Sequence, residues 1–204
     1  MMNDYNNPII MDWINQGKPL PPPDAYKLAV IKDYAQRFSM NNFIETGTYY
    51  GNMVLGVKDV FKRIFSVELD NNLYINANRK FSVFPHISIF HGDSGKVMPN
   101  ILSLIHEPCL FWLDGHWIGS IGPNNQVKTG KGELTTPILA ELNHIFNHPI
   151  KNHVILIDDA RLFNGLGDYP AVNQLKKYVL ARNPALIFEN TDDMIRIYPR
   201  SKGV

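Results

Sequence analysis

The sequence of 204 residues has very little cysteine and almost no excess of charge of either sign. Cys109 is the only cysteine, which excludes a disulfide within the chain. Its apolar neighbours predict a small buried side chain in a reducing compartment. The formal net charge is +1 and no long basic run occurs, so nothing indicates a nucleic-acid partner or an anionic membrane surface.

Long hydrophobic runs are also missing. No apolar run approaches the length needed to cross a bilayer. The first ten residues, MMNDYNNPII, lack the basic start and apolar core of a signal peptide. We therefore expect a cytoplasmic protein. An apolar content of 45% with 19% charged residues is typical of a globular chain, and the length suits one domain.

Proline divides the chain into a leader and a domain. Residues 1–23 end in Pro19 and Pro21–Pro23, which favour extended backbone, so this leader is predicted to be extended. Asp24 is predicted to N-cap a helix that runs to about Phe38. Residues 24–204 show no internal repeat and are predicted to form a single domain.

The stretch from Asn42 to Asp70 organises the rest of the chain. It has the pattern of a strand, a glycine turn, a helix and a second strand. Gly47 and Gly51, four residues apart, allow a ligand to approach the backbone at a helix N-terminus. Glu68 lies about twenty residues beyond, at the spacing of an acid that accepts hydrogen bonds from ribose hydroxyls.

The dinucleotide fingerprint G-x-G-x-x-G is not met, because Tyr49 and Asn52 stand at its second and third glycine positions. The pattern acid-x-G-x-x-x-G, led by Glu45, instead resembles motif I of the class I S-adenosylmethionine-dependent methyltransferases. This resemblance implies a cofactor site formed by the following residues: Glu45, Gly47, Thr48, Tyr49, Gly51, Glu68, Asp93, Ser94 and Asp114. In it, Glu68 would bind the ribose and Asp93 would lie close to the adenine. A packed βαβ turn without a ligand is the alternative for the stretch.

The remaining chain alternates apolar strands with helical patterns. Further strands are predicted at residues 87–90, 109–113 and 153–157, and a hairpin at 186–198. The family resemblance, from about residue 40 onward, implies an α/β Rossmann-like fold. Its seven-stranded, mostly parallel sheet would have helices on both faces and a C-terminal antiparallel hairpin. The glycine-rich residues 118–134 are predicted to form a lid or binding loop.

Six acidic residues follow predicted strands: Glu45, Glu68, Asp93, Asp114, Asp158 and Asp159. In an open parallel sheet these strand ends share one edge, where ligands bind. Asp114, Asp158 and Asp159 end two strands that should be neighbours. Three carboxylates at one point suit a hard divalent cation such as Mg²⁺. Binding of backbone donors by the Asp158–Asp159 pair is the alternative.

This constellation resembles the metal-dependent sugar O-methyltransferases similar to macrocin O-methyltransferase. That group carries D-G-D after strand four and I-D-D after strand five. Here the residues are Asp114-Gly115-His116 and Ile157-Asp158-Asp159. The resemblance implies metal ligands at Asp114, Asp158 and Asp159. At the third position of the first motif, those enzymes carry an acidic residue that is the supposed general base. This chain has His116 there, and a histidine is itself suited to act as a general base.

The sequence therefore predicts an S-adenosylmethionine-dependent methyltransferase. A hydroxyl of a sugar, another small molecule or a glycoconjugate would be the acceptor, with Mg²⁺ assistance. Two alternatives remain, a nucleotide-dependent oxidoreductase on a Rossmann sheet and a non-catalytic binding protein with this fold. The sequence leaves the acceptor and the oligomeric state open, a homo-oligomer included.

Overall fold

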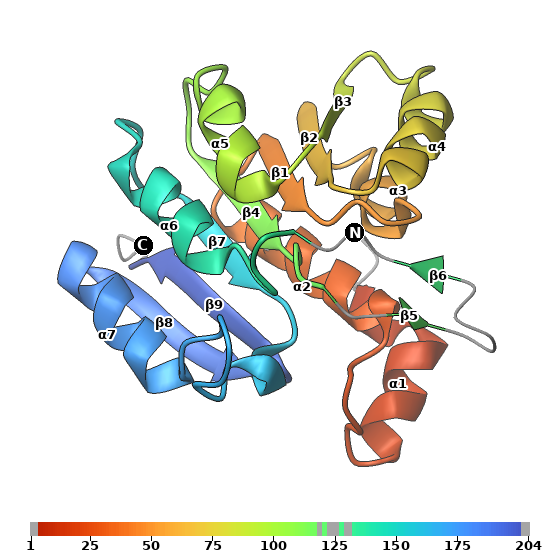
Figure 1. Cartoon of the computed structure of the whole chain (residues 1–204). Helices are drawn as coiled ribbons and strands as arrows, with labels where there is room; N and C mark the ends of the chain where they lie inside the picture. The colour runs from red at the N-terminus through yellow and green to blue at the C-terminus, as the bar shows by residue number, and fades with distance from the viewer. Residues whose placement is uncertain (1–3, 118–119, 122–126, 129–131, 201–204) are drawn as a thin grey trace.

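A seven-stranded sheet forms the centre of the computed structural model, which describes residues 4–117, 120–121, 127–128 and 132–200 (Figure 1). Its strand order is β3-β2-β1-β4-β7-β9-β8. The strands are β1 (Asn42–Thr46), β2 (Arg63–Glu68), β3 (Ile87–His91), β4 (Cys109–Leu113), β7 (Val154–Ile157), β8 (Leu186–Thr191) and β9 (Met194–Pro199). This confirms the predicted fold class.

The order of the strands creates a switch point beside β1. From β1 the chain moves outward through β2 to β3, and it then returns to place β4 on the other side of β1. The pairs β1–β2, β2–β3, β1–β4 and β4–β7 are all parallel. Because crossovers leave in opposite directions from β1, a crevice forms at the carboxyl ends of β1 and β4.

The predicted terminal hairpin consists of β8 and β9. The last strand, β9, lies between β7 and β8 and is antiparallel to both. Two residues at its turn, Asp192 and Asp193, have left-handed backbone angles, with φ of 50° and 61°. Aspartate tolerates this conformation better than most residues, so a tight turn fits here.

Both faces of the sheet are buried, so successive residues of a strand are apolar. In β1, Phe43 packs on one face and Ile44 on the other. In β4, Leu110 and Trp112 belong to the first face, while Phe111 belongs to the second. Continuous apolar strands are what a parallel sheet covered on both sides requires.

Helices cover the two faces in two groups (Figure 1). The first face is covered by α2 (Asp24–Arg37), α3 (Asn52–Val57) and α4 (Asn71–Phe81), and α1 (Pro8–Asn15) packs against α2. The second is covered by α5 (Ser94–Leu102), α6 (Ile138–Asn147) and α7 (Val172–Arg182). Short 3₁₀ helices occur before α1, at η1 (Asp4–Asn6), and after β7, at η3 (Ala160–Leu162).

The leader is not extended as predicted, because it contains α1. Asn7 caps this helix by accepting a hydrogen bond from the Ile9 N–H, and Pro8 occupies the first turn, where a proline is tolerated. Trp13 lies with its ring centroid 4.6 Å from that of Tyr26 on α2. The prolines that suggested extended backbone lie beyond the helix. Asp24 is the first residue of α2 and Pro23 is its N-cap, one residue from the prediction.

The predicted lid, residues 118–134, lies partly outside the described residues. Its described part includes a two-stranded antiparallel ribbon, β5 (Ser120–Ile121) with β6 (Val127–Lys128). The ends of the stretch are joined, because the Trp117 N–H donates to the Thr135 carbonyl at 2.9 Å. Among the described helices, none is long and apolar enough to cross a membrane.

Candidate functional site

A cavity of about 220 Å³ opens at the switch point between β1 and β4. It contains most of the site residues predicted from the sequence. Those that line it are Gly47, Tyr49, Glu68, Asp93, Ser94, Asp114, His116, Asp158 and Asp159. The residues Gly132, Leu134, Thr135 and Trp117, from the two ends of the predicted lid, line it as well.

The turn after β1 approaches the end of β4 very closely. Gly47 has φ of +85°, which glycine adopts easily. A Cβ atom at this position would lie 2.6 Å from the Asp114 carbonyl oxygen. Glycine is therefore required here both by backbone angle and by the neighbouring strand.

Glu68 holds this turn in place. Its Oε2 accepts a hydrogen bond from the Tyr49 N–H at 2.7 Å, and its Oε1 accepts one from the Asp70 N–H at 2.8 Å. Burial raises the pKa of Glu68, although these two backbone donors act in the opposite direction. Each carboxylate oxygen can accept more than one hydrogen bond, so a ligand hydroxyl can still bind.

Three predicted cofactor residues do not line the cavity. The Glu45 carboxylate is 1% exposed and accepts a hydrogen bond from the Ser66 hydroxyl, which also lies 2.5 Å from Thr48 Oγ1. Burial raises the pKa of Glu45 well above its usual range. A Cβ atom at Gly51 would meet the Phe81 ring at 2.5 Å. Glu45, Thr48 and Gly51 therefore stabilise the turn through contacts outside the cavity.

Asp93 begins α5, as predicted. Its Oδ1 accepts a hydrogen bond from the Gly95 N–H at 2.8 Å. The neighbouring Ser94 hydroxyl donates to Glu141 Oε1 at 2.5 Å. Burial raises the pKa of Glu141 to about 7, although the Ser94 hydroxyl acts in the opposite direction. Ser94 thus lines the cavity while its hydroxyl is bound to α6.

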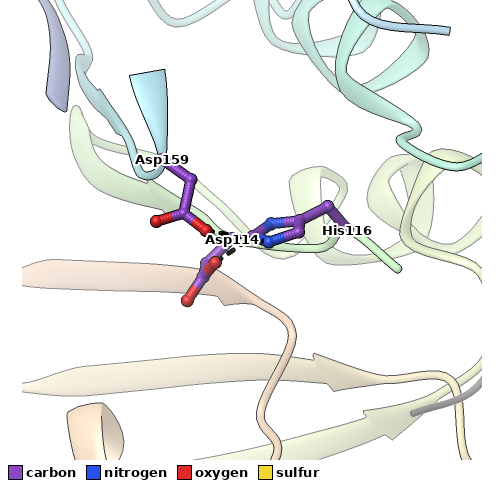
Figure 2. A group of neighbouring side chains, drawn as sticks. All are labelled: Asp114, His116 and Asp159. Carbon is purple, nitrogen blue, oxygen red and sulfur yellow. Dashed lines mark ion pairs between the residues drawn. The ribbon is translucent and has the colours of Figure 1, made fainter. Parts of the chain in front are cut away.

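Asp114, His116 and Asp159 form a compact group at the ends of β4 and β7 (Figure 2). The His116 ring points between the two carboxylates. Its Nδ1 lies 3.2 Å from Asp114 Oδ1, and its Nε2 lies 3.0 Å from Asp159 Oδ2. One ligand atom from each residue can be chosen so that all lie within 4.8 Å of one another. The three side chains thus converge on one point.

The two carboxylates dominate the ionisation of this histidine. Burial lowers the pKa of His116, but Asp114 and Asp159 outweigh it and raise the pKa to about 10. Burial raises the pKa of Asp159, and the His116 cation opposes this and lowers it to about 2. Without another cation, His116 is therefore protonated at neutral pH and cannot accept a proton as a base does.

Asp158 does not join this group, in contrast to the predicted metal set. Its Oδ2 accepts a short hydrogen bond from Lys27 Nζ, and its Oδ1 accepts one from the Asp159 N–H at 2.9 Å. Burial and the Asp114 charge raise the pKa of Asp158 to about 7, although Lys27 opposes them. A cation from α2, and not the Asp114–His116–Asp159 group, is thus the side-chain partner of this carboxylate.

Lys27 is a site residue that sequence reasoning missed. It lies on α2, far from β7 in the sequence, and it lines the cavity. A signal was present, because Lys27 precedes Val30, Ile31 and Tyr34 at the spacing of one helix face. All four residues of this face are buried. A lysine in a buried stripe requires an anionic partner.

Asp159 is held by the terminal hairpin. It has a left-handed backbone with φ of +55°. Its Oδ1 accepts a hydrogen bond from Arg161 Nη1 at 2.7 Å, and the same nitrogen pairs with Asp193 at the β8–β9 turn. Asp193 also accepts from the Ala160 and Arg161 N–H groups, each at 2.8 Å. The hairpin therefore orients the loop after β7.

Comparison with known proteins shows similarity in structure alone. No protein-family model matches the chain, and no curated protein sequence matches it. The O-methyltransferase from Bacillus cereus, in complex with S-adenosylhomocysteine, is similar with a TM-score of 0.61 at 11% identity. The match covers 94% of this chain and 89% of that one.

Two further solved structures differ in the atom they methylate. TomG, the Streptomyces achromogenes O-methyltransferase involved in tomaymycin synthesis, in complex with S-adenosylmethionine, has a TM-score of 0.57 at 13% identity, covering 95% of this chain and 89% of that one. The N-methyltransferase NodS from Bradyrhizobium japonicum WM9 has a TM-score of 0.51 at 13% identity, covering 96% and 98%. These likenesses show the fold, and the fold by itself leaves the acceptor open.

Proposed function

We propose that the protein is an S-adenosylmethionine-dependent O-methyltransferase. The observation that carries this proposal is the cavity at the switch point, which has two chemically different halves. The β1–β3 half consists of Gly47, Tyr49, Glu68 and Asp93. The β4–β7 half consists of Asp114, His116, Asp158, Asp159 and Lys27. Cofactor-bound O-methyltransferases with the same fold support this assignment.

The β1–β3 half would bind the cofactor. Gly47 lines the cavity and has no side chain of its own, so its backbone would lie against the methionine portion. Glu68 would accept from the ribose hydroxyls, and Asp93 would accept from the adenine amino group. Glu45, Thr48 and Gly51 would act on the cofactor through the shape of the turn.

The β4–β7 half would hold the acceptor hydroxyl close to the sulfonium methyl group. The hydroxyl oxygen forms a bond to the methyl carbon as the carbon–sulfur bond breaks, which leaves neutral S-adenosylhomocysteine and releases the hydroxyl proton. Alignment of the oxygen, carbon and sulfur supplies most of the rate enhancement in such a transfer. His116 would take the proton only after its ring has lost its own, because two carboxylates hold it protonated.

The donor set fits a divalent cation at Asp114, His116 and Asp159. His116 is half-buried, and its Nε2, which is buried, has no well-directed hydrogen bond among the described residues, although Asp159 lies 3.0 Å away. A bound cation would supply Lewis acidity that lowers the pKa of an acceptor hydroxyl. Because one ligand is a nitrogen, Mn²⁺ or Zn²⁺ suits this set as well as the Mg²⁺ expected for three carboxylates.

A sugar, another small hydroxylated molecule or a glycoconjugate would be the acceptor. Trp117 lines the β4–β7 half and is 38% exposed, and Tyr49 lines the opposite wall. Aromatic rings offer apolar faces on which a sugar or aromatic ring can pack. These two side chains support an acceptor with a flat apolar face next to its hydroxyl.

Calorimetric titration with S-adenosylhomocysteine tests the proposal, once with Mn²⁺ and once with EDTA. Saturable binding is expected in both, because the β1–β3 half needs no metal. Glu68→Gln should weaken binding about tenfold by loss of the anionic acceptor. The control Asp59→Asn, whose carboxylate is 82% exposed, should have no effect.

The outcome also separates the alternatives. Binding of NADH with none of S-adenosylhomocysteine would overturn the proposal in favour of an oxidoreductase. Tight binding of S-adenosylhomocysteine without methyl transfer to any hydroxyl acceptor would favour a non-catalytic binding protein.

A further inference from the structure

The buried ion pair between Lys27 and Asp158 joins helix α2 to the end of β7. The Lys27 residue is 9% exposed, and the Asp158 residue is 3% exposed. Removing two charges from water costs about as much free energy as their attraction returns, so a buried pair is weak evidence for a role in stability alone. The pair also lines the cavity, which gives it access to a ligand.

The position of Asp158 makes this pairing important for the neighbouring group. Asp158 directly precedes Asp159, whose N–H donates to Asp158 Oδ1 at 2.9 Å. Its second oxygen is occupied by the Lys27 ammonium. Asp158 therefore has its carboxylate beside the Asp114–His116–Asp159 group, while the ammonium holds it out of that group.

We propose that Lys27 is a positioning residue that competes with a divalent cation for Asp158. While the Lys27 ammonium is present, the ligands available to the divalent cation are Asp114, His116 and Asp159. When the ammonium is removed, the Asp158 carboxylate becomes a fourth anionic partner for the metal. This inference rests on the metal component of the proposed function and goes beyond it by naming the residue of α2 that limits metal affinity.

Charge supports the same conclusion. Among the described cavity-lining residues, the positively charged side chains are Lys27 and His116, against five carboxylates. Like charges at one site require a cation. The Lys27 ammonium offsets the negative charge of Asp158, so a metal at the site has less negative charge left to offset. Loss of Lys27 leaves an uncompensated buried carboxylate beside Asp159, and a divalent cation bound to Asp114 and Asp159 would lie close enough to compete with a proton for it.

Calorimetric titration with Mn²⁺ alone tests the inference without an acceptor or turnover. Lys27→Met should bind Mn²⁺ about tenfold more tightly than the unchanged protein, since changes beside metal ligands alter affinity by about that much. Lys27→Arg keeps the cation and should leave the affinity unchanged. The double variant Lys27→Met/Asp158→Asn should return to the original affinity, because it removes the ligand as well.

Two single variants keep the inference testable even when Lys27→Met fails to fold. Asp158→Asn should weaken Mn²⁺ binding only slightly, through the unpaired charge of Lys27, whereas Asp159→Asn removes a ligand and should weaken it about tenfold or more. Equal weakening by both would overturn the inference, as would a folded Lys27→Met variant without a gain, or a gain that persists in the double variant. Absence of Mn²⁺ binding in every variant would also overturn it. Binding of S-adenosylhomocysteine, measured in parallel in EDTA, reports separately on the proposed function.

Discussion

The two halves of the cavity neutralise their carboxylates in different ways. In the β1–β3 half, Glu68 and Asp93 accept hydrogen bonds from backbone N–H groups within a few residues along the chain or in the adjoining turn. In the β4–β7 half, Asp158 and Asp159 pair with the charged side chains of Lys27, His116 and Arg161. Formal cations pair with the carboxylates of the β4–β7 half, whereas Glu68 and Asp93 accept hydrogen bonds from neutral backbone N–H groups.

This difference has a functional meaning. Carboxylates held by backbone donors have oxygens that can also accept from the hydroxyl and amino groups of the proposed cofactor. Carboxylates held by cations form a group whose charge changes when a cation is gained or lost. We therefore expect the β4–β7 half to respond more strongly than the β1–β3 half to pH, to the proposed metal and to substitution of charged side chains.

The largest effect should follow from breaking a charged pair of the β4–β7 half. Asp158→Ala leaves the Lys27 ammonium buried without its partner and should lower the free energy of unfolding by about 4 kcal/mol. Urea unfolding would measure this. Glu68→Ala leaves only neutral N–H groups without their acceptor and should lower the free energy of unfolding by about 2 kcal/mol. Equal costs in the two halves would contradict the comparison.

The junction of the two halves should be nearly as sensitive. Gly47→Ala combines a left-handed backbone with a contact at 2.6 Å to the Asp114 carbonyl oxygen. We expect a loss of about 3 kcal/mol in urea unfolding, together with loss of S-adenosylhomocysteine binding. Gly17→Ala is a matched control, because Gly17 has φ of +82° with nothing within 4 Å of the added Cβ atom. The control should lose only about 1 kcal/mol.

The pH dependence of stability should sharpen the contrast further. The pKa of His116 is raised to about 10, so the folded state binds more protons than the unfolded state between pH 6.5 and 10. The stability that His116 contributes to the folded state is fully present below pH 6.5 and is lost as the pH rises through 10. Urea unfolding in EDTA should show this loss of stability as the pH rises from 6.5 to 10, and His116→Gln should abolish it.

His153 provides the opposite case, at the start of β7 and away from the cavity. Burial and the neighbouring His148 lower its pKa to about 4. The unfolded state then binds more protons between pH 4 and 6.5, so stability is complete above pH 6.5 and falls as the pH drops toward 4. His153→Gln should flatten the acid side of the same curve and leave the alkaline side unchanged. Loss of the alkaline slope in this variant would contradict the assignment to His116.

The smallest effect should come from the local cap of the β1–β3 half. Asp93→Ala removes the acceptor for the Gly95 N–H and should cost about 1 kcal/mol in thermal or urea unfolding. Asp93→Asn retains a capping oxygen and should be nearly neutral in stability. A stability loss in Asp93→Asn as large as that in Asp93→Ala would show that the charge, and not the cap, is what α5 requires.

Much of the fold followed from patterns within short stretches. Apolar runs at 109–113 and 153–157 predicted strands, and β4 and β7 are found there. Asp93 predicted the start of α5, and the two strands near the C-terminus predicted the hairpin. The prediction of an extended leader was wrong. Its prolines favour extended backbone only after residue 18, whereas Asn7 caps a helix whose apolar Ile10 and Trp13 are buried.

The site was predicted less completely than the fold. Acidic residues at strand ends were located correctly because strand periodicity is local, and topology then brings strand ends to one edge. The sequence did not show how the charges pair, since His116 lies between Asp114 and Asp159 while Asp158, the third predicted metal ligand, pairs with Lys27. The reason is Lys27, whose pairing with Asp158 spans 131 positions of the chain.

By itself, then, the sequence determined the elements, their caps and the residues that end each strand, because these depend on interactions between near neighbours along the chain. Only the tertiary structure decided which charges meet. It placed the Lys27 ammonium on Asp158, the His116 ring between Asp114 and Asp159, and the hairpin residue Asp193 on Arg161. Coulombic pairing acts over a few ångströms in space, whatever the separation along the chain, so it appears only once α2, β4, β7 and β9 are packed together.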